Sequence, residues 1–150
     1  MGRFKKLNHT IYECKYHVVW IPKYRFRVME GEVRLYVRDV LRRMCEWRKV
    51  EIIEGNVCAD HIHVVLDMPP KLSVAEVLGF LKGKSAVRIF KKFPRLRKKY
   101  WGMHYWSPGY CVTTVGLDEE MIRRYVRWQQ KQDQENDAAQ QQDLFKGGAL

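Results

Sequence analysis

The chain has 150 residues with 46% hydrophobic side chains, a size and composition that suit one globular domain with a single packed core. No apolar stretch is long enough to cross a membrane, and the basic N-terminal segment lacks the apolar block of a signal peptide, so we expect neither. A formal net charge of +11 indicates a polyanionic partner, because lysine and arginine displace the counterions that condense on a phosphate backbone.

Periodicity along the chain predicts an alternation of strands and helices. Alternating side chains and apolar runs predict strands over residues 12–21, 50–56, 61–67 and 110–115. Helical spacing predicts helices over residues 33–47, over 73–93 with Ser73 as the cap, and after Asp118. Pro94 ends or kinks the second helix. The order β-α-β-β-α-β predicts an α+β, ferredoxin-like (RRM-like) sandwich: an antiparallel sheet, two helices on one face, and a C-terminal helix.

The third predicted strand contains His61 and His63, which are two residues apart and therefore share one face. Ile62, Val64 and Leu66 point the other way, where we expect them to pack under the helices. Two neighbouring imidazoles can form half of a divalent-metal site. The alternative is an ordinary strand in which one histidine is hydrogen-bonded and the other lies near solvent.

The last helix contains Tyr125 and Gln129, which are four residues apart and lie on one helical face. A tyrosine is a competent nucleophile towards phosphorus, and a glutamine oxygen is a hard ligand suited to Mg²⁺ or Mn²⁺. Because the final helix could cover the free face of the sheet, we expect Tyr125 and Gln129 to meet the histidine pair there. Taken alone, Tyr125 could equally be a packing aromatic.

Basic residues gather in two segments that aromatic residues accompany. Candidate DNA contacts are Lys23, Arg25, Lys82, Lys84, Arg88, Lys91, Lys92, Arg95 and Arg97. The nearby rings of Tyr24, Phe26, Tyr100, Trp101, Tyr105 and Trp106 suit unstacked bases of a single strand. The alternative is a solvated helix face with core aromatics, which we favour only for Trp47, inside a helical stripe.

Several ordered motifs resemble one known family. They are residues 17–25 (HVVWIPKYR), 60–63 (DHIH), 93–96 (FPRL), 106–110 (WSPGY), 114–116 (TVG) and 122–129 (IRRYVRWQ). The chain is similar in these motifs, their order and their spacing to the single-tyrosine HUH transposases, the TnpA-type enzymes of IS200/IS605-like insertion sequences. This resemblance covers most of the chain, from about Tyr12 to Gln129.

The resemblance implies a DNA transposase that cuts and rejoins single-stranded DNA through a 5′-phosphotyrosine, without ATP. Tyr125 would be the nucleophile, and His61, His63 and Gln129 would bind Mg²⁺ or Mn²⁺. It also implies DNA ends folded into hairpins, and a homodimer in which Tyr125 of one subunit completes the histidine site of the other. Two alternatives from other classes remain: a non-catalytic ferredoxin-like nucleic-acid-binding module, and a palindrome nickase adopted by its host. A replication or mobilisation nickase would share the histidine pair, but such enzymes carry extra domains.

Residues 79–85 (GFLKGKS) resemble a nucleotide-binding loop, but the spacing is one residue short and the segment lies in a helical pattern. We therefore expect no nucleotide cofactor. The four cysteines show no Cys-x-x-Cys pairing, which indicates reduced thiols and a cytoplasmic protein. Residues 1–131 are predicted to form the catalytic domain, and 132–150 a polar tail with no apolar stripe to bury.

Overall fold

A computed structural model describes residues 4–7, 9–100, 104–114 and 119–147. The strands are β1 (Lys5–Leu7), β2 (Thr10–Tyr12), β3 (Lys15–Trp20), β4 (Glu51–Val57), β5 (Ile62–Asp67) and β6 (Cys111–Thr113). The helices are η1 (Lys23–Arg25), α1 (Gly31–Trp47), α2 (Val74–Lys92), α3 (Pro94–Arg97) and α4 (Glu119–Gly147).

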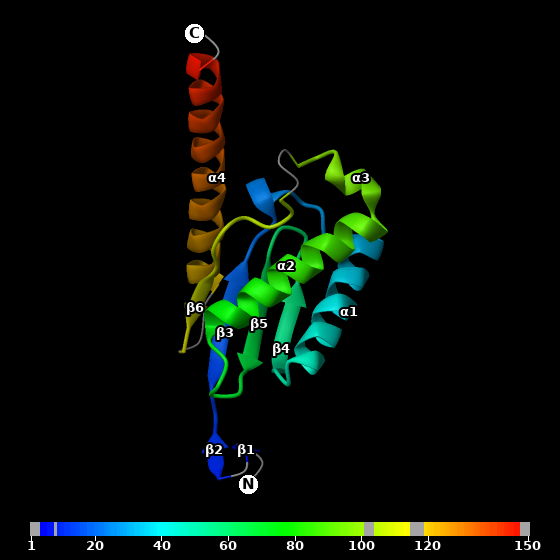
Figure 1. Cartoon of the computed structure of the whole chain (residues 1–150), viewed down its shortest axis with the longest axis vertical. Helices are drawn as coiled ribbons and strands as arrows, with labels where there is room; N and C mark the ends of the chain where they lie inside the picture. The colour runs from blue at the N-terminus through cyan, green and yellow to red at the C-terminus, as the bar shows by residue number, and fades with distance from the viewer. Residues whose placement is uncertain (1–3, 8, 101–103, 115–118, 148–150) are drawn as a thin grey trace.

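The main sheet has the strand order β4-β5-β3-β6, and every neighbouring pair is antiparallel. The two crossovers through α1 and α2 make this the predicted ferredoxin-like arrangement. The predicted first strand, 12–21, is interrupted, because Cys14 leaves the ladder and its N–H donates to the Asp67 carboxylate at 3.0 Å. Its first residue, Tyr12, belongs instead to a separate β1–β2 hairpin, which was not predicted and lies beyond the end of the main sheet (Figure 1).

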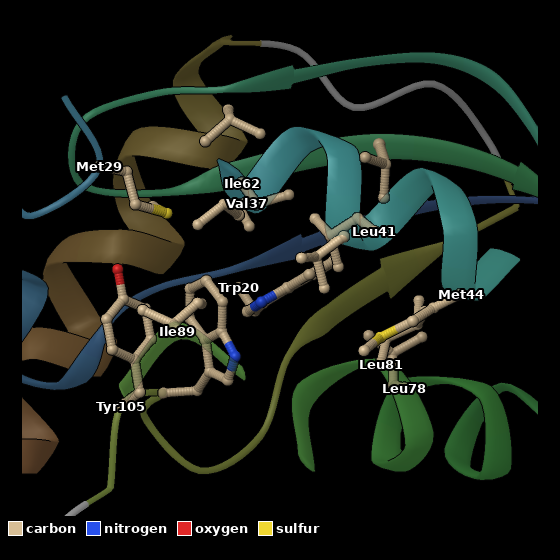
Figure 2. Packing of buried hydrophobic residues seen from close by; sticks show 14 of the residues in the cluster. Trp20, Met29, Val37, Leu41, Met44, Ile62, Leu78, Leu81, Ile89 and Tyr105 are labelled. Atoms are coloured by element: carbon tan, nitrogen blue, oxygen red, sulfur yellow. The ribbon is translucent and has the colours of Figure 1, made fainter. Parts of the chain in front are cut away.

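The main core lies between the sheet and the pair α1 and α2. Trp20 of β3 and Ile62 of β5 meet side chains from both helices, as Figure 2 shows. Those helical side chains include Val37, Leu41, Met44, Leu78, Leu81 and Ile89. Val64 and Leu66 are buried in the same cluster, so the predicted inward face of the histidine strand is confirmed.

Helix α4 packs on the opposite face of the sheet. Val19 and Ile21 point away from the main core and form a second small cluster with Val126 of α4. Tyr125 and Ile122 pack against this cluster. Figure 1 shows α4 at the β6 side of the sheet, running well past the end of the strands. The final helix therefore covers part of the face on which the histidines lie.

The helix boundaries follow local signals, with some corrections. The Ser73 hydroxyl accepts the Glu76 N–H at 3.1 Å, which confirms the predicted cap of α2. Pro94 separates α2 from the short α3, and residues 79–85 lie inside α2. The predicted cap Asp118 lies outside the described residues. Trp47 was expected in the core but is 58% exposed, because it ends α1 at the surface with Arg88 5.0 Å from its ring.

The polar segment after Lys131 continues the helix α4 to Gly147. The expectation that nothing there could be buried is wrong at Asp133, which is 2% exposed because polar partners surround it. Asp137 lies 3.7 Å from the Lys23 ammonium. The division at residue 131 stays a prediction. Among the described residues, none of the helices has the length and apolar character required to span a bilayer.

Candidate active site

The histidine pair lies where β5 begins, at the centre of the sheet. His63 is opposite Val19 of β3 and Asn56 of β4, and His61 immediately precedes the strand. Since Val19 faces α4, its cross-strand neighbour His63 faces that side as well. Both imidazoles are half-buried, and His63 Nε2 is buried without a hydrogen-bond partner. An orphaned, buried ring nitrogen is what a metal ligand needs before the ion arrives.

Asp60 orients the ring of His61. The His61 Nδ1 lies 2.9 Å from Asp60 Oδ1, and the Arg25 Nε donates to Asp60 Oδ2 at 2.9 Å. Although burial acts to raise it, the pKa of Asp60 is lowered overall by His61 and Arg25, so this carboxylate is ionised and can only accept. Nδ1 of His61 therefore donates a proton to Asp60, which leaves Nε2 as the ring nitrogen available to a metal. This carboxylate–histidine arrangement is typical of metal ligands.

The electrostatic surroundings keep His63 neutral. Its pKa is lowered chiefly by burial; Glu54 opposes this shift, and the neighbouring His17 and His61 add to it. A neutral imidazole is the form that binds a metal. The orientation of His61 and the neutral form of His63 therefore both suit the binding of a divalent cation.

Tyr125 lies on the same side of the sheet, packed against the Val19–Ile21–Val126 cluster. Its hydroxyl is buried without a hydrogen-bond partner, and burial raises the pKa of the phenol. Its ring stands 6.5 Å from that of Trp128, which is 57% exposed. The phenol is therefore stored in protonated form close to the sheet and next to an exposed aromatic surface.

Gln129 is 6% exposed, and its amide does not point freely at the histidines. The Nε2 group donates to Asp133 at 3.4 Å, and Oε1 faces the loop at Gly109. No group of three or more histidine, cysteine, aspartate or glutamate side chains that could hold a metal occurs among the described residues. A single chain thus brings together the two histidines and places Tyr125 on their side, but it ties Gln129 to another partner.

The candidate DNA contacts divide into engaged and free cations. Lys82 donates to the carbonyls of Ser107 and Gly109, and Arg25 pairs with Asp60. Burial lowers the pKa of Lys82 to about 8, against the pull of Asp133. The exposed members of the predicted set lie on the second half of α2 and on α3: Lys84, Lys91, Lys92, Arg95 and Arg97. These five remain the better candidates for phosphate contact.

Three of the six aromatics proposed as base-stacking surfaces belong to the core instead. Tyr100, Tyr105 and Trp106 are at most 6% exposed and pack against one another and Phe90. They cannot stack on bases as they stand, so that expectation is wrong for them. Trp101 lies outside the described residues. Phe26 remains partly exposed, beside Tyr24.

Two contributors to the site were missing from the sequence-based set. Asp60 appeared only as part of the histidine motif, and Asp133 fell in the segment predicted to be a polar tail. A signal for Asp133 was present, since Tyr125, Gln129 and Asp133 are spaced four apart and share one face of α4. Trp128 also stands out as an exposed ring next to the tyrosine.

The described residues thus form a ferredoxin-like sheet with a histidine pair and a tyrosine-bearing helix on the same face. The family model described as "Transposase IS200 like" matches residues 10–129. The chain belongs to this family of DNA transposases, as the sequence motifs indicated.

Individual relatives agree with this assignment. The transposase for insertion sequence element IS200 of Salmonella typhimurium is 45% identical over 133 residues, which cover 89% of this chain and 88% of the relative. The ISDra2 transposase TnpA of Deinococcus radiodurans is 36% identical over 126 residues, covering 83% and 90%. The crystal structure of a protein assigned as a transposase, from Deinococcus radiodurans R1, superposes with a TM-score of 0.77. It is 34% identical, and the match covers 83% of this chain and 97% of that one.

Proposed function

We propose that this transposase is a metal-dependent endonuclease and strand transferase for single-stranded DNA, with Tyr125 as the nucleophile. The observation that carries the proposal is the geometry of the histidine pair. His61 is oriented by Asp60, His63 Nε2 is buried without a partner, and both lie on the side of the sheet that α4 covers. The ion they fit is a divalent cation such as Mg²⁺ or Mn²⁺, with Gln129 as a third ligand.

The chemistry follows from these groups. A bound cation would withdraw charge from a non-bridging oxygen of the scissile phosphate and fix the phosphorus for in-line attack. The Tyr125 hydroxyl gives up its proton and its oxygen forms a bond to phosphorus, while the bond to the 3′ oxygen of the preceding nucleotide breaks and that oxygen takes up a proton. The products are a 5′-phosphotyrosine and a free 3′-hydroxyl. One ester replaces another, so a different 3′-hydroxyl can reverse the step without ATP.

We further infer that the site is completed between two subunits of a homodimer. Within one chain Gln129 is held by Asp133, and the Tyr125 hydroxyl is buried in the apolar cluster. Both groups must leave these positions to act on a phosphate. An α4 helix supplied by a partner subunit would present them to the histidine pair without unfolding either chain. The exposed ring of Trp128 beside Tyr125 offers a surface for a base next to the scissile phosphate.

Labelled single-stranded DNA carrying the hairpin ends of the cognate element tests the proposal. With Mg²⁺ or Mn²⁺, denaturing electrophoresis should show a covalent protein–DNA adduct and a released 3′-ended strand. Tyr125→Phe and His63→Ala should each abolish the adduct. Tyr36→Phe is the matched control, because Tyr36 packs against Phe93 on the opposite side of the sheet, and it should keep the adduct.

The two alternative functions give different results in the same assay. A non-catalytic binding module would retain the hairpin DNA without metal, form no adduct, and be indifferent to Tyr125→Phe. A host-adopted nickase would form the adduct on dispersed palindromes and not on the ends of an element. An adduct that persists in Tyr125→Phe would show that another group is the nucleophile.

A further inference from the structure

The carboxylate of Asp133 joins three separate parts of the chain inside the protein. Its Oδ2 accepts the backbone N–H of Tyr24 at 3.0 Å, and its Oδ1 accepts the Ser107 hydroxyl at 2.8 Å. The same Oδ1 accepts Nε2 of Gln129 at 3.4 Å. Burial raises the pKa of Asp133, but these hydrogen bonds and the charges of Lys23 and Lys82 oppose the shift. A buried carboxylate with this many partners fixes the positions of those partners.

One of those partners is a turn with an unfavourable backbone. Tyr24 and Arg25 have φ values of 62° and 55°, so two consecutive residues with side chains occupy the left-handed region. Such a conformation persists only where the surroundings hold it. Here the Lys23 N–H donates to the Tyr105 carbonyl at 2.8 Å, and the Tyr24 N–H donates to Asp133. Asp133 is therefore a direct restraint on the turn η1.

The same turn reaches the histidine pair. Arg25, the next residue after Tyr24, places its Nε 2.9 Å from Asp60 Oδ2. The other oxygen of Asp60 is 2.9 Å from Nδ1 of His61. A continuous set of short contacts thus runs from the tyrosine-bearing helix to the ring of His61.

We propose that Asp133 is a positioning residue that sets the orientation of His61 through the Tyr24–Arg25 turn and Asp60, while it also holds the Gln129 amide. This inference rests on the proposed function of the histidine pair. If Asp133 has this role, the docking of α4 on the sheet and the orientation of the His61 ring occur together. A displacement of α4 releases Gln129 and, at the same time, loosens the turn that holds Asp60.

The first test follows the His61 ring in metal-free, full-length protein. Imidazole ¹⁵N shifts distinguish a ring protonated at Nδ1 from one protonated at Nε2. The wild type should show the Nδ1–H form, and Asp133→Ala should show a mixture of both. Arg25→Gln removes the contact between Arg25 and Asp60 without changing a residue of α4, and it should give the same mixture. Glu135→Gln, at an exposed carboxylate of α4 that pairs with Lys131, is the matched control and should leave the signals unchanged.

The second test measures the affinity for Mn²⁺ by calorimetry, with circular dichroism to confirm that each variant is folded. Loss of an outer partner of a metal ligand typically weakens binding ten- to a hundredfold, and we expect about tenfold for Asp133→Ala. Asp133→Asn retains an acceptor for the Tyr24 N–H and should recover most of the affinity. If Asp133 acts through Asp60, Asp133→Ala combined with Asp60→Asn should be no weaker than Asp60→Asn alone.

The outcomes separate the inference from the function on which it rests. A folded Asp133→Ala protein with wild-type His61 signals and an Mn²⁺ affinity within twofold of wild type would overturn the positioning role. The positioning role would also be overturned if the loss of Mn²⁺ affinity in the double variant equalled the product of the losses in Asp133→Ala and Asp60→Asn. Wild-type protein that binds no Mn²⁺, or binds it equally in His63→Ala, would contradict the metal site, while the ring signals still decide whether Asp133 orients His61.

Discussion

The residues of the proposed site lie in buried positions that the proposed chemistry would have to change. His63 Nε2 and the Tyr125 hydroxyl are buried without partners, and Gln129 is tied to Asp133. Buried polar atoms without partners are unfavourable for folding, so removing such an atom need not lower the stability of the protein. Function and stability should therefore separate when these residues are replaced.

Among single substitutions, Tyr125→Phe should separate the effect on activity from the effect on stability most clearly. The substitution removes a buried hydroxyl that has no partner, so the free energy of unfolding should rise by about 1 kcal/mol or stay unchanged. Urea denaturation followed by circular dichroism measures this, alongside the loss of the DNA adduct. A decrease of more than about 1 kcal/mol would indicate that the hydroxyl has a stabilising partner.

Lys82 should make stability depend on pH. Its pKa is lowered in the folded protein from 10.5 to about 8, chiefly by burial. Between these values the unfolded chain binds more protons than the folded one, so stability rises with pH across that window. The difference in unfolding free energy between wild type and Lys82→Met should therefore shift in favour of wild type from pH 8 to 10.5. Lys84→Met, a substitution at an exposed neighbouring position of α2, is the matched control.

At the scale of elements, the histidine strand depends on a close approach by β4. Gly55 lies opposite Val64, and a Cβ placed there would stand 2.8 Å from Val64 Cγ1 and 3.4 Å from the His63 carbonyl. Val64 is buried under the helices and is stiff at its first torsion, so it cannot move aside freely. The position thus requires glycine for space, next to a site residue.

A pair of glycine-to-alanine substitutions tests this packing. Gly55→Ala should lower the free energy of unfolding by about 1–3 kcal/mol, as overpacking of a core does. Gly79→Ala is the control: it lies in the exposed face of α2 with nothing within 4 Å of the added Cβ, and it should stabilise the protein by about 0.5–1 kcal/mol. Equal effects of the two changes in denaturant titrations would contradict the close approach.

For the whole molecule, the arrangement is a sheet with a different partner on each face. Helices α1 and α2 cover one face with the main core, and α4 is attached to the other by a small apolar cluster and by polar contacts. Asp133 and Asp137 add contacts from the second half of α4 to the turn η1. The attachment of the last helix therefore depends more on polar interactions than that of the first two helices.

Truncation measures how much these polar contacts contribute to the stability of the protein. A chain ending at residue 137 keeps Asp133 and Asp137, whereas a chain ending at residue 131 loses both. We expect the longer chain to be more stable by about 2 kcal/mol or more, since hydrogen bonds to a buried carboxylate are among the stronger ones. Thermal denaturation of the two proteins gives the comparison. Equal stabilities would indicate that residues 132–137 contribute nothing to the attachment of α4.

Local periodicity was sufficient to predict much of the molecule. Alternation along the β5 sequence separated His61 and His63 from Ile62, Val64 and Leu66, and the structure confirms the buried face of that strand. The order of strands and helices determined the fold class, and the cap at Ser73 marked where α2 begins. These features depend on residues that are near one another in the chain, so their spacing is enough.

Only the tertiary structure decided which polar groups become partners across the chain. Residues as distant as Tyr24, Ser107 and Asp133 meet in one buried network, and composition had placed Asp133 in a polar tail. The rings of Tyr100 and Tyr105 proved to be core for the same reason. Burial depends on what other segments bring to a position. The sequence by itself therefore determined the fold, the family and the face of each histidine, whereas the packing of distant segments decided how α4 holds Tyr125 and Gln129.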